Sequence, residues 1–123
     1  MKQLLFVYNA DAGFFNMVTD IAHKIFSPAT YPCSLCDLTY GILKIRPEWE
    51  QFVQNAPVPF TFLHKDEFLA AYPDLKHTTL PVVLFMEETG HSELITAAEL
   101  QQFQTVKALS LAILDRLSFS LNA

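Results

Sequence analysis

Residues 79–100, "TLPVVLFMEETGHSELITAAEL", predict a strand, a turn and a second strand in close succession. The β-branched apolar run "VVLF" (82–85) directly follows Pro81, as expected of a buried strand with a defined start. Gly90 supplies the turn, and "SELIT" (92–96) predicts a short edge strand. The two strands should therefore pair as an antiparallel hairpin.

A helix should follow this hairpin. Thr96 and Glu99 have the spacing of a capping box, in which each side chain satisfies a backbone N–H at the helix start. Apolar residues then recur along one face of a long terminal helix, at Leu100, Phe103, Val106, Leu109, Ile113 and Leu117. The sequence predicts one long, bent helix from 97 to 117.

The amino-terminal part predicts a strand followed by a helix. "LLFVY" (4–8) is continuously apolar, which is typical of a strand covered on both faces of a sheet. The helix is predicted from six apolar residues at spacings of three and four, namely Phe14, Met17, Val18, Ile21, Ala22 and Ile25. It should end near Ser27, because Pro28 disfavours helical geometry in the residue before it.

Four further elements are expected in the middle of the chain. They are a short helix from about 33 to 40, a helix in "RPEWEQFVQNAP" (46–57), a strand in "FTFLH" (60–64) and a short helix in "KDEFLAAY" (65–72). Pro47 suits a first helical position, Gly41 suits a helix end, and Asp66 is the expected cap of the last helix.

This order of elements resembles the thioredoxin-like fold over most of residues 3–117. "TLPVVLF" (79–85) is similar to the strand that opens with a cis-proline in that family, and "GHSELITAAELQQF" (90–103) is similar to the turn, edge strand and capped helix that follow it. The resemblance implies a single α/β domain over residues 1–123. It has three layers: a central four-stranded mixed sheet with helices on both faces.

The active-site motif of that family, Cys-Gly-Pro-Cys, is absent from its usual place. A gap-free alignment of "YNADAGFFNMV" (8–18) puts Ala12 and Phe15 where the two cysteines would be. Only Pro81, matching the cis-proline, carries over. Cys33 and Cys36 lie after the first predicted helix, so we expect them at the opposite edge of the sheet from Pro81.

Cys33 and Cys36, the two cysteines of the chain, have three interpretations. The first is a redox pair, in which Cys33 attacks a disulfide and Cys36 resolves the mixed disulfide, as in a thiol–disulfide oxidoreductase. The second is a zinc site, for which a histidine or a second subunit must supply further ligands. The third is a pair of buried, unreactive thiols. The sequence leaves all three open.

Other residues are candidates for binding a substrate or partner. Leu80 and Pro81 should border the working end of the fold, and Asp11 follows the first strand, where it either binds a polar group or caps a helix. His64 and His77 are interpreted as surface or satisfied histidines. The function we expect is thus a thiol-dependent redox or binding module that uses Cys33 and Cys36. The alternatives are a non-catalytic protein-interaction or scaffold domain, expected to be a homodimer, and a zinc-binding protein.

Composition limits the class of partner. With 123 residues, 51% of them hydrophobic, the chain fits one domain. The net charge of −5, without a basic block, argues against nucleic acid and a membrane surface as partners. We expect a cytoplasmic protein without a targeting segment or bound cofactor, whose partner is a protein or a small-molecule thiol or disulfide.

Overall fold

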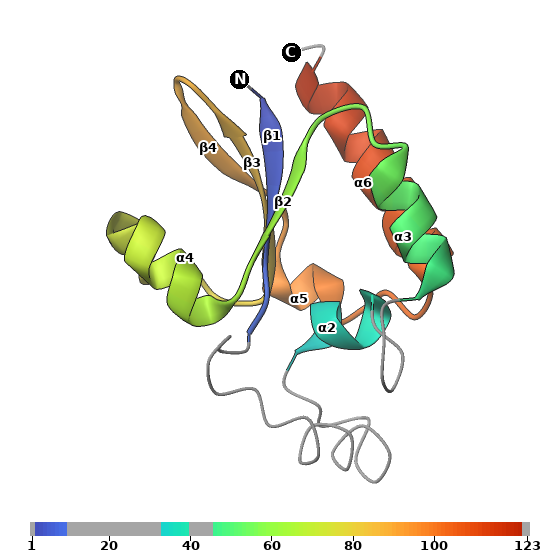
Figure 1. Cartoon of the computed structure of the whole chain (residues 1–123), viewed down its shortest axis with the longest axis horizontal. Helices are drawn as coiled ribbons and strands as arrows, with labels where there is room; N and C mark the ends of the chain where they lie inside the picture. The colour runs from blue at the N-terminus through green and yellow to red at the C-terminus, as the bar shows by residue number, and fades with distance from the viewer. Residues whose placement is uncertain (1, 10–32, 40–45, 122–123) are drawn as a thin grey trace, which may run out of the picture.

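The computed structural model describes residues 2–9, 33–39 and 46–121, and its centre is a four-stranded mixed sheet (Figure 1). The strands are β1 (Gln3–Val7), β2 (Phe60–Leu63), β3 (Val82–Glu87) and β4 (Gly90–Ile95), in the order β2-β1-β3-β4. β1 runs parallel to β2 and antiparallel to β3, and β3 and β4 form the predicted hairpin. The predicted α/β class and the four-stranded mixed sheet are confirmed.

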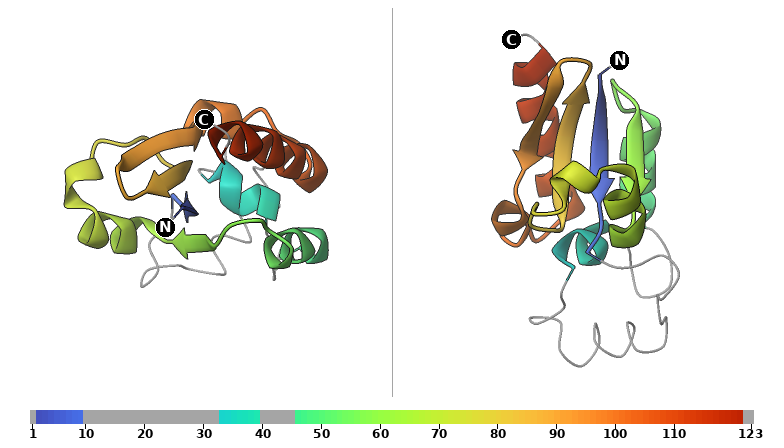
Figure 2. Two further views of the ribbon diagram at one scale, coloured as in Figure 1. Left: turned by 90° about the horizontal axis from the view of Figure 1, so that it is seen from above. Right: turned by 90° about the vertical axis from the view of Figure 1, so that its left-hand side faces the viewer.

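Helices lie on both faces of this sheet. They are α2 (Ser34–Thr39), α3 (Pro47–Gln54), α4 (Lys65–Ala71), α5 (Ala97–Leu100) and α6 (Val106–Leu121), with a 3-10 turn, η2 (Pro73–Leu75), after α4. α4 covers one face, whereas α3 and α6 lie side by side on the other (Figures 1 and 2). The helix predicted over 14–25 lies outside the described residues.

Strand β1 is apolar from Leu4 to Val7 because it faces a separate apolar cluster on each side. Leu4 and Phe6 belong to the larger cluster, together with residues of α2, α3, α5 and α6. Leu5 and Val7 point to the opposite face, where Phe68 of α4 is fully buried. Successive side chains of a strand alternate between faces, so a strand covered on both sides must be continuously apolar.

Aromatic rings fix α3 against the two parallel strands. The Phe6 ring lies edge-on to Trp49, with 5.5 Å between the ring centroids, and it also contacts Phe60 and Phe62 at 4.8 and 4.9 Å. Trp49 is completely buried. Because such rings bury large apolar areas, this aromatic group anchors α3 to strands β1 and β2.

The prediction of one terminal helix is wrong, since the chain forms α5 and α6 separated by a turn. Thr105 starts the second helix: its hydroxyl oxygen accepts a hydrogen bond from the Ala108 N–H at 3.1 Å. This is an ordinary N-cap, and it begins a new helix although the apolar pattern continues across it. Leu109, Ile113 and Leu117 are nevertheless buried along one face of α6, as the periodicity predicts.

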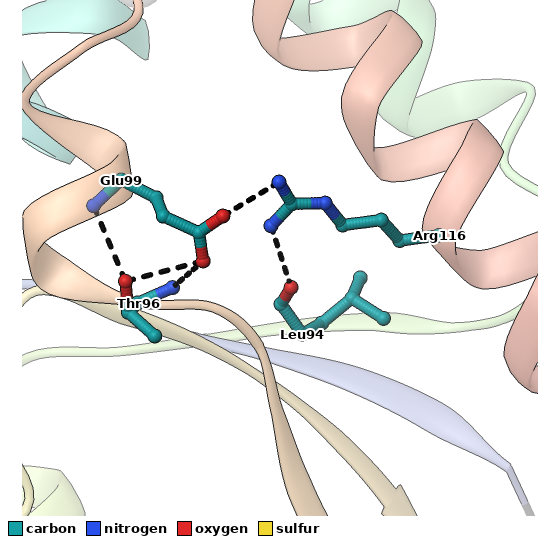
Figure 3. A network of polar contacts seen from close by, with 4 residues as sticks. All are labelled: Leu94, Thr96, Glu99 and Arg116. Carbon is teal, nitrogen blue, oxygen red and sulfur yellow. Dashed lines mark hydrogen bonds and ion pairs between the residues drawn. The ribbon is translucent and has the colours of Figure 1, made fainter.

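The predicted capping box at α5 is confirmed, and a distant arginine extends it (Figure 3). The Glu99 carboxylate accepts from the Thr96 N–H at 3.1 Å, and the Glu99 N–H donates to the Thr96 hydroxyl at 3.2 Å. Arg116 of α6 lies 2.6 Å from the same carboxylate and donates to the Leu94 carbonyl of β4 at 3.0 Å. The hydrogen bond from Arg116, followed by that from the Thr96 backbone, lowers the pKa of Glu99.

Candidate functional site at the carboxyl end of strand β1

Pro81 marks one end of the sheet. The Leu80–Pro81 peptide bond is cis, as the resemblance implied. The next residue, Val82, pairs with Val7 at the carboxyl end of β1, so Pro81 lies beside that end. Pro81 itself is buried, and the half-buried Leu80 packs against the smaller apolar cluster.

Cys33 lies at the same end of the sheet. The Asn9 N–H, two residues beyond β1, donates a hydrogen bond to the Cys33 sulfur at 3.4 Å. The expectation that this cysteine lies at the opposite edge from Pro81 is therefore wrong. It followed from the place of Cys33 after the first predicted helix, whereas the structure brings Cys33 into contact with Asn9, 24 positions earlier in the chain.

The Cys33 sulfur is enclosed by the larger apolar cluster. The residue is 1% exposed, and it is disulfide-bonded. It directly precedes α2, which lies next to α5 below the sheet (Figure 1). Leu35 of α2 is fully buried, and the Thr39 hydroxyl donates back to the Leu35 carbonyl at 2.9 Å. The core thus fixes the backbone that carries Cys33.

A histidine occupies the neighbouring strand end. The Tyr8 N–H donates to the Leu63 carbonyl at 2.9 Å, which continues the β1–β2 ladder by one residue and sets His64 beside Tyr8. The two rings are 5.7 Å apart between centroids. Tyr8 belongs to the same apolar cluster as Cys33, so His64 and Cys33 lie on the same face and at the same end of the sheet.

Glu67 holds His64 in place. Its carboxylate accepts from the His64 backbone N–H at 2.8 Å and lies 2.9 Å from the ring Nδ1. The backbone hydrogen bond, followed by that of the ring, lowers the pKa of Glu67. His64 is consequently the N-cap of α4, and the prediction that Asp66 caps this helix is wrong. The Asp66 carboxylate instead accepts from the Glu67 N–H at 3.0 Å.

Of the residues proposed from the sequence, Cys33, Leu80 and Pro81 lie at the same end of the sheet, but Leu80 packs against the smaller apolar cluster, on the face opposite Cys33. Asp11 and the side chain of Cys36 lie outside the described residues, so the predictions for them remain predictions. His64 was not proposed as a site residue. The signal that could have found it is the His64-x-x-Glu67 spacing directly after a strand, which resembles the Thr96-x-x-Glu99 spacing of α5.

Within the described ranges, no group of three or more His, Cys, Asp or Glu side chains is placed to hold a metal ion. In the same part of the chain, no helix has both the length and the apolar character needed to cross a membrane.

Comparison with known proteins gives no relative for this chain: no family model, no curated protein and no solved structure matches it. The function must therefore be argued from the site itself.

Proposed function

We propose that this protein is a divergent thioredoxin-like domain in which Cys33 and Cys36 form a redox pair for thiol–disulfide exchange. The observation that carries the proposal is the hydrogen bond from the Asn9 N–H to the Cys33 sulfur. This contact supports a reactive cysteine at the carboxyl end of β1, the end of the sheet at which Pro81 lies. It does so even though a long segment of chain separates β1 from α2. The strand order β2-β1-β3-β4 and the cis Leu80–Pro81 bond agree with this class of fold.

The Asn9 N–H gives the Cys33 sulfur a chemical property that the reaction needs. A hydrogen-bond donor stabilises a thiolate more than a neutral thiol, so it favours the nucleophilic form. In the reduced pair, a thiolate attacks one sulfur of a disulfide, a new S–S bond forms, and the other sulfur leaves as a thiolate that takes up a proton. The second cysteine then attacks the first, closing the Cys33–Cys36 bond and releasing the remaining thiol.

Burial of Cys33 restricts the reactant. At 1% exposure the sulfur offers no surface to a folded protein disulfide. We therefore assign a small-molecule thiol or disulfide as the reactant, since it needs far less space to reach either sulfur of the pair. The overall exchange is balanced: two cysteine thiols lose two electrons and two protons, and the small disulfide gains them as it becomes two thiols.

Equilibration in glutathione redox buffers tests the proposal. The protein is quenched with acid, alkylated and weighed by mass spectrometry over a range of glutathione and glutathione disulfide ratios. We expect a reversible two-electron transition between a doubly alkylated and an unalkylated form. Cys33→Ser and Cys36→Ser should each abolish this transition and leave a mixed disulfide with glutathione. Cysteines that stay fully alkylated, or fully resistant to reduction, across the whole range would refute the redox role.

A second candidate function, a non-catalytic interaction domain, is supported by exposed apolar side chains on α6. They are Leu111, Leu114 and Phe119, which are 57%, 41% and 84% exposed. Phe119 also borders a hollow of about 370 Å³ between α6 and the edge strand β4, together with Leu94. Large exposed apolar groups that lie close together are typical of interaction surfaces.

Sedimentation velocity distinguishes this second function. We expect self-association that Phe119→Ser weakens, whereas the control Lys107→Ser on the same helix leaves it unchanged. A single monomeric species at all concentrations would argue against a homodimer formed through this face.

A further inference from the structure

We propose that His64, held by Glu67 and Tyr8, is the proton-exchange group of the Cys33–Cys36 pair. This inference rests on the proposed redox function and adds a residue to it. In thiol–disulfide exchange the imidazole takes up the proton that a cysteine thiol loses on becoming the attacking thiolate. It then returns a proton to the small thiolate that leaves. His64 thus moves protons to and from the reacting sulfurs and forms no covalent bond to the substrate.

Placement is the first argument for this role. The carboxyl ends of the two parallel strands β1 and β2 are adjacent, and each carries one member of the site just beyond its last residue. Asn9 contacts the Cys33 sulfur from the end of β1. His64 lies at the end of β2, beside Tyr8, which immediately precedes Asn9. The consecutive residues Tyr8 and Asn9 thus contact the imidazole and the sulfur, respectively, at one end of the sheet.

Orientation is the second argument. One oxygen of the Glu67 carboxylate contacts both the backbone N–H and the ring Nδ1 of His64, at 2.8 and 2.9 Å, so the ring is held at Nδ1. A carboxylate at one ring nitrogen fixes the imidazole and leaves the other nitrogen to exchange protons. About 42% of the His64 side chain is exposed, which gives the ring access to solvent protons that the buried Cys33 lacks.

The groups around the His64 ring come from α4 and from the end of β1. Glu67 is the acidic group that faces the ring, and the hydrogen bonds to His64 lower the pKa of this carboxyl. Lys65 and Asp66 follow in the chain at the start of α4, and Tyr8 faces the ring from just beyond the end of β1. The Glu67 carboxylate thus places a negative charge in direct contact with the His64 ring.

Kinetics of a small disulfide provide the test. The full chain is reduced, and its oxidation by glutathione disulfide is followed from about pH 5 to 8, the range in which imidazole groups ordinarily change charge. We expect His64→Gln to slow the reaction by roughly tenfold to a hundredfold near neutral pH and to remove one inflection from the pH profile. His91→Gln, which removes an exposed imidazole on β4, is the matched control and should behave as wild type.

A second readout separates proton exchange from a general structural role. In ¹H–¹³C NMR spectra at constant pH, we expect the His64 imidazole signals to shift between the oxidised and reduced protein. The His91 signals should stay in place. Because coupling between two sites is reciprocal, a histidine that affects the cysteines must itself sense their redox state. Thermal unfolding and the emission of Trp49 check that His64→Gln folds normally.

The outcomes distinguish this inference from the function on which it rests. If the wild-type cysteines do not cycle in glutathione buffers, both proposals fail. If they cycle, but His64→Gln keeps the wild-type rate and pH profile, the role of His64 is refuted and the redox function stands. Histidine signals that are identical in the two redox states would refute it as well.

Discussion

Helices α4 and α5 begin with the same local arrangement but differ in what surrounds it. In each helix a glutamate at the third position accepts a hydrogen bond from the backbone N–H of the N-cap residue. Glu67 does so for His64 at 2.8 Å, and Glu99 does so for Thr96 at 3.1 Å. Both carboxyl groups have a lowered pKa, but the leading cause is a backbone N–H at Glu67 and the Arg116 side chain at Glu99.

The difference lies in the partner from outside the helix. At α5, Arg116 reaches from α6 and binds both the Glu99 carboxylate and the Leu94 carbonyl, which ties together a strand and two helices (Figure 3). At α4, the polar partner is His64 itself, and the group stays open to solvent. The same capping geometry is thus part of the structural framework at α5, whereas at α4 it holds a histidine ring at the end of β2, beside Tyr8.

Removing the core support of the Cys33 region should have the largest effect. Leu35 is fully buried in α2, whereas Leu111 of α6 is mostly exposed. We expect Leu35→Ala to lower the free energy of unfolding by about 2–5 kcal/mol, because it removes apolar contacts and leaves a cavity. Leu111→Ala is the control and should change it by less than about 0.5 kcal/mol. Similar losses in the two variants, measured by urea denaturation, would mean that α2 is not anchored in the core.

Removing the cap of α5 should have the next largest effect. Thr96→Ala takes away the acceptor of the Glu99 N–H, so we expect the unfolding free energy to fall by about 1 kcal/mol. Thr96→Ser keeps a hydroxyl at this position and should recover most of that loss. If the serine variant is as unstable as the alanine variant, the threonine methyl group rather than the hydrogen bond stabilises the helix start.

The contact between Arg116 and Glu99 should contribute less and should depend on pH. The folded-state pKa of Glu99 is below its ordinary value of 4.5, so the unfolded chain binds the proton first as the pH falls. The stabilisation is therefore complete above that value and is lost as the pH drops through the lowered pKa. Because both side chains are more than a third exposed, Arg116→Met should cost at most about 1 kcal/mol at neutral pH.

Urea denaturation of the wild type and Arg116→Met, repeated at decreasing pH, measures this effect. The two unfolding free energies should converge in acid. A constant difference across the pH range would show that Arg116 acts through the Leu94 carbonyl or through packing instead of through the carboxylate.

The smallest effect on stability is expected at the start of α4. Glu67→Gln keeps an acceptor for the His64 N–H and removes a charge on an exposed side chain, so the melting temperature should stay close to that of the wild type. Differential scanning calorimetry can compare the melting temperatures of Glu67→Gln and Glu99→Gln. We expect Glu99→Gln to melt at the lower temperature. Equal decreases in the two variants would mean that both carboxylates belong to the structural framework.

Much of the fold could be predicted from local patterns. The apolar run of β1, the proline before β3, the hairpin and the Thr96–Glu99 box each depend on neighbouring residues, and each is found where it was expected. The break between α5 and α6 was missed because the Thr105 cap leaves the apolar periodicity intact. The cap at His64 was missed because Asp66 is the more common residue type for that position.

The sequence by itself determined the strands and most of the helices, because backbone preferences and apolar periodicity act over a few residues. It also identified the two cysteines as candidate site residues. Only the tertiary structure decided that Cys33 lies against Asn9, that His64 lies beside Tyr8 and that Arg116 reaches Glu99. These contacts join residues that are far apart in the chain. They depend on which strands pair and in what register, and no local pattern contains that information.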